Sequence, residues 1–326
     1  MRIVFMGTPE YAEVCLRGVR EAGYEVAAVY TQPDRPKGRK GELSAPPVKE
    51  YALSQGIPVF QPERIRRKAE VERLRQLKPD LILVAAYGQI LSKAILSIAP
   101  CINAHASLLP RYRGCSPIQR AIAAGESVTG VTVMRMDEGV DTGNMILTRE
   151  VPVTDQDTGD SLEMKLAEAG AEAFLAALSA WEAGDDLTGV PQDESLATYA
   201  PMLSREDGRM DWSLSAKEME RAVRAFTSWP ASFTRWKGKT LKVQEVRVFL
   251  ESGRPGGHPN GTVFTREEAA GLGAKPDRQI LVQTGDGVLE LRALQLPGKK
   301  MLQADAFLRG CPLLGERLGE DEEPEL

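Results

Sequence analysis

The two histidines are the first residues to consider as catalysts, because imidazole exchanges protons near neutral pH. His258 lies in Gly256-Gly257-His258-Pro259-Asn260-Gly261, a sequence typical of an exposed turn between strands. Asn103 and His105 follow an apolar strand pattern, and alternation along a strand places them on the same face. A carboxamide beside an imidazole at the carboxyl end of a parallel strand lies where α/β sheets bind ligands. By themselves these two residues fit either a catalytic pair or a hydrogen-bonded structural histidine.

Two neighbouring segments carry further groups. Residues 107–114 read Ser-Leu-Leu-Pro-Arg-Tyr-Arg-Gly, and residues 137–143, after the next strong strand, read Asp-Glu-Gly-Val-Asp-Thr-Gly. Another turn, Gly7-Thr8-Pro9, follows the first strand but lacks the three-glycine spacing of dinucleotide-binding folds, which disfavours a nicotinamide cofactor.

Together these motifs resemble the formyltetrahydrofolate-dependent formyltransferase family. Its signature is Asn-x-His followed by Ser-Leu-Leu-Pro, with a downstream acidic, glycine-rich loop ending in Asp-x-Gly. The resemblance implies that Asn103, His105 and Asp141 are the catalytic residues. It also implies that 10-formyltetrahydrofolate is the formyl donor and that it is bordered by Ser107, Leu108, Leu109, Pro110, Tyr87, Gly88, Asp137 and Gly139.

These residue types suit formyl transfer. A neutral amine attacks the formyl carbon and gives a tetrahedral species whose oxygen becomes negative. Asn103 can donate its amide N–H to that oxygen, and His105 can donate a ring N–H or carry a proton to the leaving folate nitrogen. Asp141 can either hold His105 in one tautomer or accept the proton of the attacking amine through water.

The acceptor of the formyl group must be inferred from residues outside this core. Within the family it is an aminoacyl-tRNA, a nucleotide-linked amino sugar, a purine precursor or, in deformylase relatives, water. Residues 31–41 form a loop with four positive charges and one negative charge, which suits contact with phosphate but also a solvated connection. With residues 45–49, this loop resembles the insertion of the family branch that formylates initiator methionyl-tRNA. That resemblance implies tRNA contacts from Arg35, Lys37, Arg39 and Lys40.

The elements that must position these residues follow from the alternation of short apolar runs and helical patterns up to about residue 180. It predicts an α/β fold with a doubly wound, mostly parallel sheet, forming a catalytic domain over residues 1–183. The predicted strands are 3–6, 26–31, 58–60, 81–85, 102–104, 131–136 and 145–151. The predicted helices are 10–22, 48–55, 65–77, 116–124 and 161–181.

The remainder of the chain has a different pattern. Residues 184–205 are polar and turn-rich and are interpreted as a linker. Residues 206–326 predict a small OB-like β-barrel, with a helix at 216–225 and strands at 241–249, 261–264, 280–284 and 288–296. Residues 205–315 carry 18 Lys and Arg against 13 Asp and Glu, and an acidic tail follows. By themselves these charges fit a solvated surface, but the resemblance implies that residues 206–326 form the tRNA-binding domain.

Composition excludes several other classes. The 326 residues are 42% hydrophobic and 27% charged, and no apolar run approaches the roughly 18 residues of a membrane span. The first residues enter a strand pattern at once, so we expect no signal peptide and a cytoplasmic protein. Four scattered cysteines and two histidines offer no metal ligand set. A net charge of -5 argues against binding nucleic acid by bulk positive charge, and nothing indicates an obligate protein partner.

Two rival functions share parts of this pattern. An amino-sugar formyltransferase would keep Asn103, His105 and Asp141 but would need no basic C-terminal domain. A non-catalytic RNA-binding protein on an enzyme scaffold would tolerate loss of His105.

Overall fold

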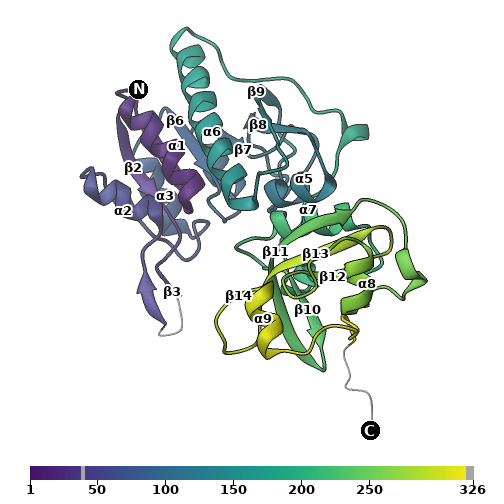
Figure 1. Cartoon of the computed structure of the whole chain (residues 1–326). Helices are drawn as coiled ribbons and strands as arrows, with labels where there is room; N and C mark the ends of the chain where they lie inside the picture. Colours follow the sequence, from purple (N-terminus) through teal and green to yellow (C-terminus); the bar gives the residue numbers. More distant parts are fainter. Residues whose placement is uncertain (38–40, 321–326) are drawn as a thin grey trace. The chain divides into compact units, whose positions relative to one another are not determined.

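The computed structural model describes residues 1–37 and 41–320 and divides into two compact units (Figure 1). The N-terminal unit comprises residues 1–118, 127–154 and 161–201. The C-terminal unit comprises residues 119–126 and 155–160 together with the chain from residue 202 onward. Each unit is described below by itself.

A seven-stranded sheet forms the centre of the N-terminal unit, in the order β5-β2-β1-β6-β7-β8-β9. The first five strands of this order are parallel, while β8 runs antiparallel to β7 and β9 antiparallel to β8. The prediction of a doubly wound, mostly parallel sheet is therefore confirmed. The strands are β1 (Ile3–Gly7), β2 (Val26–Tyr30), β5 (Val59–Phe60), β6 (Leu81–Ala85), β7 (Cys101–His105), β8 (Val128–Arg135) and β9 (Met145–Pro152).

The direction of winding reverses between β1 and β6. From β1 the chain adds β2 and β5 on one side, and it then crosses to add β6 and β7 on the other. Ligands of open α/β sheets bind beyond the carboxyl ends of the strands at such a reversal. The helices along this part of the chain are α1 (Glu10–Glu21), α2 (Pro47–Ser54), α3 (Lys68–Gln76), α4 (Lys93–Leu96), α5 (Pro117–Ala124) and α6 (Gly159–Glu182), of which most of α5 and the first residues of α6 belong to the C-terminal unit. Only α4 was not predicted, because four residues are too few to display a helical period.

A two-stranded hairpin projects from the N-terminal unit where the sequence predicts a loop (Figure 1). Its strands are β3 (Arg35–Lys37) and β4 (Glu42–Ser44), which pair antiparallel. The loop predicted for residues 31–41 is therefore wrong for the three residues of β3, because a Pro-, Lys- and Gly-rich composition also permits a short hairpin.

The segment interpreted as a linker, residues 184–205, lies largely against the N-terminal unit. Val190 pairs with Met145 at the start of β9, and Tyr199 pairs with Arg113 in an isolated bridge. The backbone N–H of Ala200 donates to the carbonyl oxygen of Arg113 at 2.7 Å. A turn-rich stretch therefore satisfies its polar backbone groups against a neighbouring loop.

The C-terminal unit contains an antiparallel sheet of five strands, in the order β10-β11-β13-β12 with β14 paired to β13. Residues 261–264, predicted as a strand, form only isolated bridges at Thr262 and Val263, since Gly261 has a left-handed φ of 83°. The elements are α7 (Ala216–Ala225), β10 (Phe233–Trp236), β11 (Lys239–Leu250), α8 (Arg266–Gly271), β12 (Ile280–Gln283), β13 (Val288–Gln295), β14 (Leu302–Gln303) and α9 (Ala304–Gly310).

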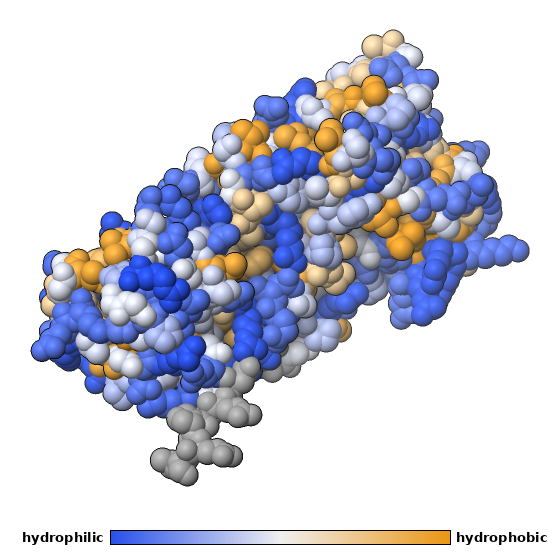
Figure 2. All heavy atoms as spheres, turned by 90° about the vertical axis from the view of Figure 1, so that its right-hand side faces the viewer, coloured by the Kyte–Doolittle hydropathy of each residue, from blue (hydrophilic) through white to orange (hydrophobic). Residues whose placement is uncertain are grey.

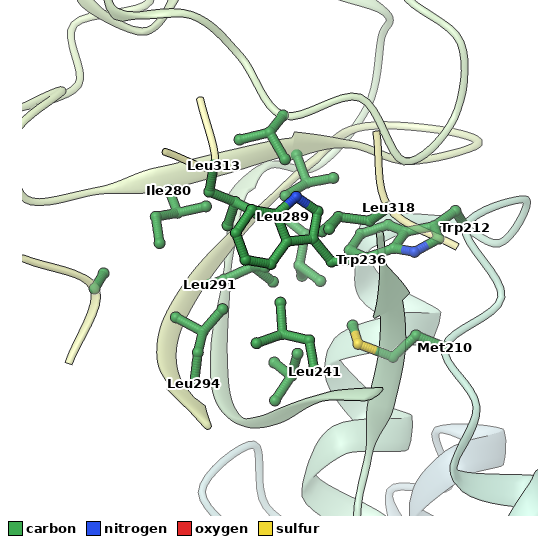
Figure 3. Packing of buried hydrophobic residues seen from close by; sticks show 14 of the residues in the cluster. Met210, Trp212, Trp236, Leu241, Ile280, Leu289, Leu291, Leu294, Leu313 and Leu318 are labelled. Carbon is green, nitrogen blue, oxygen red and sulfur yellow. The ribbon is translucent and has the colours of Figure 1, made fainter. Parts of the chain in front are cut away.

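Apolar side chains of the C-terminal unit form a large core cluster, shown in Figure 3, and a smaller cluster around Phe264 and Leu281. Trp212 and Trp236 lie among leucines of β11 and β13, and the indole N–H of Trp212 donates to the Thr234 hydroxyl at 3.0 Å. This bond satisfies the polar end of a buried indole while its rings add apolar contact area.

The face shown in Figure 2 is largely hydrophilic, with hydrophobic residues interspersed among charged ones. No helix within residues 1–37 and 41–320 is long and apolar enough to cross a membrane.

Asp207 stabilises the start of the C-terminal unit. Its Oδ2 accepts hydrogen bonds from the Ser204 N–H and hydroxyl, both at 2.8 Å, and its Oδ1 accepts one from Arg120 at 2.5 Å. The bonds from Ser204, helped by Arg120, lower the pKa of Asp207 to about 2. Because the folded pKa lies below the unfolded value, this stabilisation is present above about pH 4 and is lost as the pH falls toward about 2.

We therefore expect Asp207→Asn to lower the free energy of unfolding at neutral pH by roughly 1 to 2 kcal/mol. Denaturant unfolding followed by tryptophan fluorescence measures this loss, which should shrink as the pH is lowered from about 4 to about 2. Glu267→Gln, at an exposed site, is the matched control and should have no effect. A loss that does not depend on pH would show that the charge of Asp207 is not responsible.

Candidate active site

His105 is the last residue of β7, and its ring is buried, with 7% of its surface exposed. Its Nε2 lies 2.9 Å from the carbonyl oxygen of Tyr112. A carbonyl oxygen only accepts hydrogen bonds, so Nε2 carries the hydrogen in the neutral ring. This leaves Nδ1 as the nitrogen that can take up or release a proton. The tautomer is therefore set by a backbone carbonyl rather than by Asp141.

Asp141 faces the free nitrogen of His105. Its Oδ2 lies 3.6 Å from Nδ1, which is longer than a direct hydrogen bond, and the N–H of Gly114 donates to the same oxygen at 2.8 Å. Asp141 has a left-handed backbone, with φ of 55°. A non-glycine residue held in this region is strained, and such residues cluster at functional sites. The carboxylate is thus placed where it attracts positive charge that develops on the ring.

Asn103 lies two residues before His105 on β7 and is also buried, with 8% exposed. Within the described residues, no hydrogen bond engages its side-chain amide. Because buried amides are normally paired, a free carboxamide beside a histidine is available to a substrate. The structure thus brings Asn103, His105 and Asp141 to one edge of the sheet, next to the winding reversal.

The Ser-Leu-Leu-Pro segment, Ser107 to Pro110, forms a fixed turn directly after His105. The Ser107 hydroxyl donates to the Arg111 carbonyl oxygen at 2.6 Å, so it is engaged within the turn. Thr132 on β8 donates to the Ser107 carbonyl oxygen at 2.7 Å and accepts from the Leu109 N–H at 3.0 Å. Leu108 is half-buried, whereas Leu109 and Pro110 are buried. The turn therefore forms a rigid, partly apolar border beside Asn103, His105 and Asp141.

Asp137 and Gly139 shape the loop that carries Asp141. Asp137 Oδ1 accepts from the Gly139 N–H at 3.0 Å and from the Thr142 hydroxyl at 2.7 Å. A Cβ on Gly139 would lie 1.9 Å from that hydroxyl oxygen, and one on Gly143 would lie 1.7 Å from the Arg135 carbonyl oxygen. The glycines of this loop are therefore required by close approach of neighbouring atoms.

Tyr87 and Gly88 follow β6 at the same edge of the sheet. The ring of Tyr87 is buried in the apolar core, with 2% exposed, so the ring is not open to a ligand. The Tyr87 carbonyl oxygen accepts from the Thr8 hydroxyl at 3.0 Å and from Gln32 Nε2 at 3.1 Å. Gly88 has a left-handed φ of 80° beside Gln32.

Of the basic residues expected to contact tRNA, the structure places two in the projecting hairpin. Arg35 is exposed in β3, and Lys37 ends that strand, whereas Arg39 and Lys40 lie outside the described residues. The base of the hairpin is fixed by Asp34, whose carboxylate accepts from Lys49 Nζ at 2.7 Å and from Gln61 Nε2 at 2.6 Å. The hydrogen bond from Lys49 is the main cause of a lowered pKa of Asp34.

The remaining histidine and the cysteines belong elsewhere. His258 Nε2 lies 2.8 Å from Glu268 Oε1 in the C-terminal unit, and its ring meets Phe264 edge-on. Burial raises the pKa of the Cys101 thiol to about 12, so this thiol stays protonated at neutral pH. No group of three or more His, Cys, Asp or Glu side chains is arranged to hold a metal ion in the described part of the chain.

Sequence reasoning assigned no role to three residues that support the site. Arg113 is almost fully buried and contacts both Gln192 and Glu194, which lie in the stretch interpreted as a linker. The only sequence signal was the arginine inside the motif of residues 107–114, and nothing in the sequence identifies its partners about 80 positions later.

Comparison with known proteins assigns the class. The model for formyl transferases matches residues 1–178, and the model for their C-terminal domain matches residues 202–312. The chain therefore belongs to the formyl transferase family, as its motifs predicted.

Within that family, the chain is similar over nearly its full length to methionyl-tRNA formyltransferases. The protein of that name from Marinobacter nauticus is 45% identical, over 95% of this chain and 96% of the relative. That from Pseudomonas fluorescens is 47% identical, over 94% and 92%. A solved N-formyltransferase from Helicobacter canadensis, in complex with folinic acid and dTDP-3-aminofucose, has a TM-score of 0.64 at 16% identity and covers 89% of this chain and 98% of its own, which supports the fold.

Proposed function

We propose that the protein transfers the formyl group of 10-formyltetrahydrofolate to the α-amino group of methionine on initiator methionyl-tRNA. The observation that carries this proposal is the grouping of Asn103, His105 and Asp141 at the carboxyl end of β7, next to the winding reversal of the sheet. It is supported by relatives named methionyl-tRNA formyltransferase, whose similarity covers nearly the whole chain.

The reaction forms a bond between the amine nitrogen and the formyl carbon and breaks the bond from that carbon to the folate nitrogen. The amine loses a proton, and the folate nitrogen gains one. The free amide of Asn103 donates to the formyl oxygen as it becomes negative. The unprotonated Nδ1 of His105 exchanges the proton, while Asp141, 3.6 Å away, stabilises the positive charge on the ring or accepts the amine's proton through water.

The folate is proposed to lie along the turn that follows β7 and the backbone after β6. The half-buried Leu108 and its neighbours Leu109 and Pro110 supply an apolar border, while backbone groups near Tyr87 and Gly88 supply polar contacts. Apolar walls with a few oriented polar groups are typical of small-molecule sites. Ser107, Asp137 and Gly139 act in this proposal by holding the shape of the loops.

Transfer of radiolabelled formyl from 10-formyltetrahydrofolate to methionine-charged initiator tRNA tests the function directly. We expect initiator tRNA to be formylated and charged elongator tRNA to be a poor acceptor. A nucleotide-linked amino sugar is the competing acceptor to include. Formylation of the sugar without formylation of tRNA would show that the acceptor is a small molecule and would contradict the proposed function.

The basic residues Arg35, Lys37, Arg39 and Lys40 provide a test of how the acceptor is recognised. We expect Arg39→Ala to lower kcat/KM for initiator tRNA about tenfold and to reduce the salt dependence of tRNA binding by about one phosphate contact, because a guanidinium neutralises a phosphate. Folate binding should be unchanged. Arg39→Lys should restore only part of the loss, since an ammonium cannot bind phosphate in two-point fashion.

The matched control for the hairpin is Arg66→Ala, at an exposed position elsewhere in the N-terminal unit, which should leave both quantities unchanged. A variant with Arg35, Lys37, Arg39 and Lys40 all changed to alanine gives the strongest contrast. If it formylates initiator tRNA as well as the wild type, the hairpin does not recognise tRNA.

A further inference from the structure

A chain of hydrogen bonds connects residues 192–194 to the loop that carries Asp141. Gln192 Nε2 donates to the Asp141 carbonyl oxygen at 2.8 Å and to the Gly143 carbonyl oxygen at 2.7 Å. Gln192 Oε1 accepts from Arg113 Nε at 3.0 Å and from a terminal guanidinium nitrogen at 2.8 Å. The two carbonyl oxygens only accept and the guanidinium only donates, so the orientation of this amide is fixed by its partners.

Arg113 is in turn held by Glu194. The guanidinium donates to both oxygens of Glu194, at 2.9 and 2.6 Å, in the two-point geometry that arginine forms with carboxylates. The Arg113 side chain is 1% exposed, whereas that of Glu194 is 69% exposed. A buried guanidinium without partners is strongly unfavourable, so Arg113, Gln192 and Glu194 fix one another.

The loop held by Gln192 needs such support. Asp141 has a left-handed backbone, and no side chain fits at Gly143. The same segment also holds the other side of the site, because the Thr198 hydroxyl accepts from the N–H of Tyr112, whose carbonyl oxygen bonds His105. Backbone around both Asp141 and His105 is thereby fixed by one stretch of chain.

We propose that Gln192, oriented by Arg113 and Glu194, is a positioning residue that holds the Asp141 carboxylate opposite Nδ1 of His105. It acts through the backbone of Asp141 and Gly143 and does not touch the substrate. This inference rests on the proposed function only for its kinetic test. It assigns the stretch after α6 to the catalytic apparatus.

Gln192→Glu is the sharpest substitution, because it keeps the shape and the acceptor toward Arg113 but replaces the donor to both carbonyl oxygens by an acceptor. We expect kcat to fall at least tenfold, with KM for folate and tRNA within twofold. In an Asp141→Asn background the same change should cost less than twofold, because the carboxylate that it positions is already absent. Leu196→Ala, at an exposed position on the same stretch, is the matched control and should stay within twofold of the wild type.

A second readout does not require activity. The chain has two histidines, so ¹⁵N-histidine NMR gives two sets of ring signals, and His258→Ala assigns them. Gln192→Glu should shift the His105 signals, and Leu196→Ala should not. The NMR measurement needs no formyl acceptor. It can therefore support or contradict the positioning role of Gln192 even if the proposed function is wrong.

Three outcomes would overturn the proposal: unchanged kcat in a folded Gln192→Glu protein, an equal loss in both backgrounds, or unchanged His105 signals. If Gln192→Glu melts at a much lower temperature than the wild type, Gln192→Ala is measured in the same cycle, and the same three outcomes apply to it.

Discussion

Alanine in place of His105 is expected to lower kcat for formylation of initiator tRNA by at least about a hundredfold, since general acid–base catalysis contributes about 10² to 10⁴. The physical reason is that Nδ1 is the only ring nitrogen free to exchange a proton, because Nε2 is engaged by the Tyr112 carbonyl oxygen at 2.9 Å. Single-turnover formylation at saturating tRNA measures the chemical step, and tRNA affinity should remain near that of the wild type.

The matched control is His258→Ala. His258 lies in the C-terminal unit and pairs with Glu268, so its loss should leave turnover nearly unchanged. Near-normal turnover of a folded His105→Ala protein would remove histidine from the mechanism, whereas RNA binding without formyl transfer by the wild type would favour the non-catalytic scaffold.

Replacing Asn103 by alanine is expected to lower kcat by about 10² to 10³, the usual cost of removing one oxyanion donor. The amide has no hydrogen-bond partner within the described residues, so its loss removes an interaction made with the reacting substrate and leaves the fold intact. The expected signature is a fall in kcat and in kcat/KM by the same factor, with KM unchanged.

Asn103→Asp is the companion variant, because it keeps the size of the side chain but replaces a donor by a negative charge. It should be at least as inactive as Asn103→Ala. An active Asn103→Asp protein would mean that the developing oxyanion is stabilised by another donor.

The predictions that succeeded rest on local patterns. Alternation along a strand was enough to place Asn103 and His105 on one face, because the period of two is a property of the backbone itself. The strand and helix order of the N-terminal unit followed in the same way. Asp141 was assigned to the site only from the family resemblance. It lies 36 positions after His105, and no local sequence pattern predicts that the two residues are close in space.

The hydrogen bonds that hold the loops around His105 and Asp141 could not be predicted from the sequence. Arg113 bonds Gln192, which is 79 positions away, and such a pairing depends on where the chain after α6 returns to the sheet. The polar stretch around Gln192 was interpreted as a linker because it lacks a periodic apolar face. Its residues satisfy their polar groups against two loops, which composition does not reveal. The hairpin at Arg35 was missed for a similar reason, since strands of three residues are too short to show an alternating pattern.

The interleaving of the two units has a consequence for how the polypeptide is made and dissected. Residues 119–126 and 155–160 leave the ribosome long before residue 202 but belong to the C-terminal unit. The hydrogen bond from Arg120 to Asp207 can form only after Asp207 has been synthesised. The Asp157 carbonyl oxygen likewise accepts, at 2.6 Å, from the guanidinium of Arg224, which is synthesised later. Neither unit is therefore encoded by one contiguous stretch of the gene. During synthesis, residues 119–126 and 155–160 must remain accessible until the last strands of the C-terminal unit have emerged.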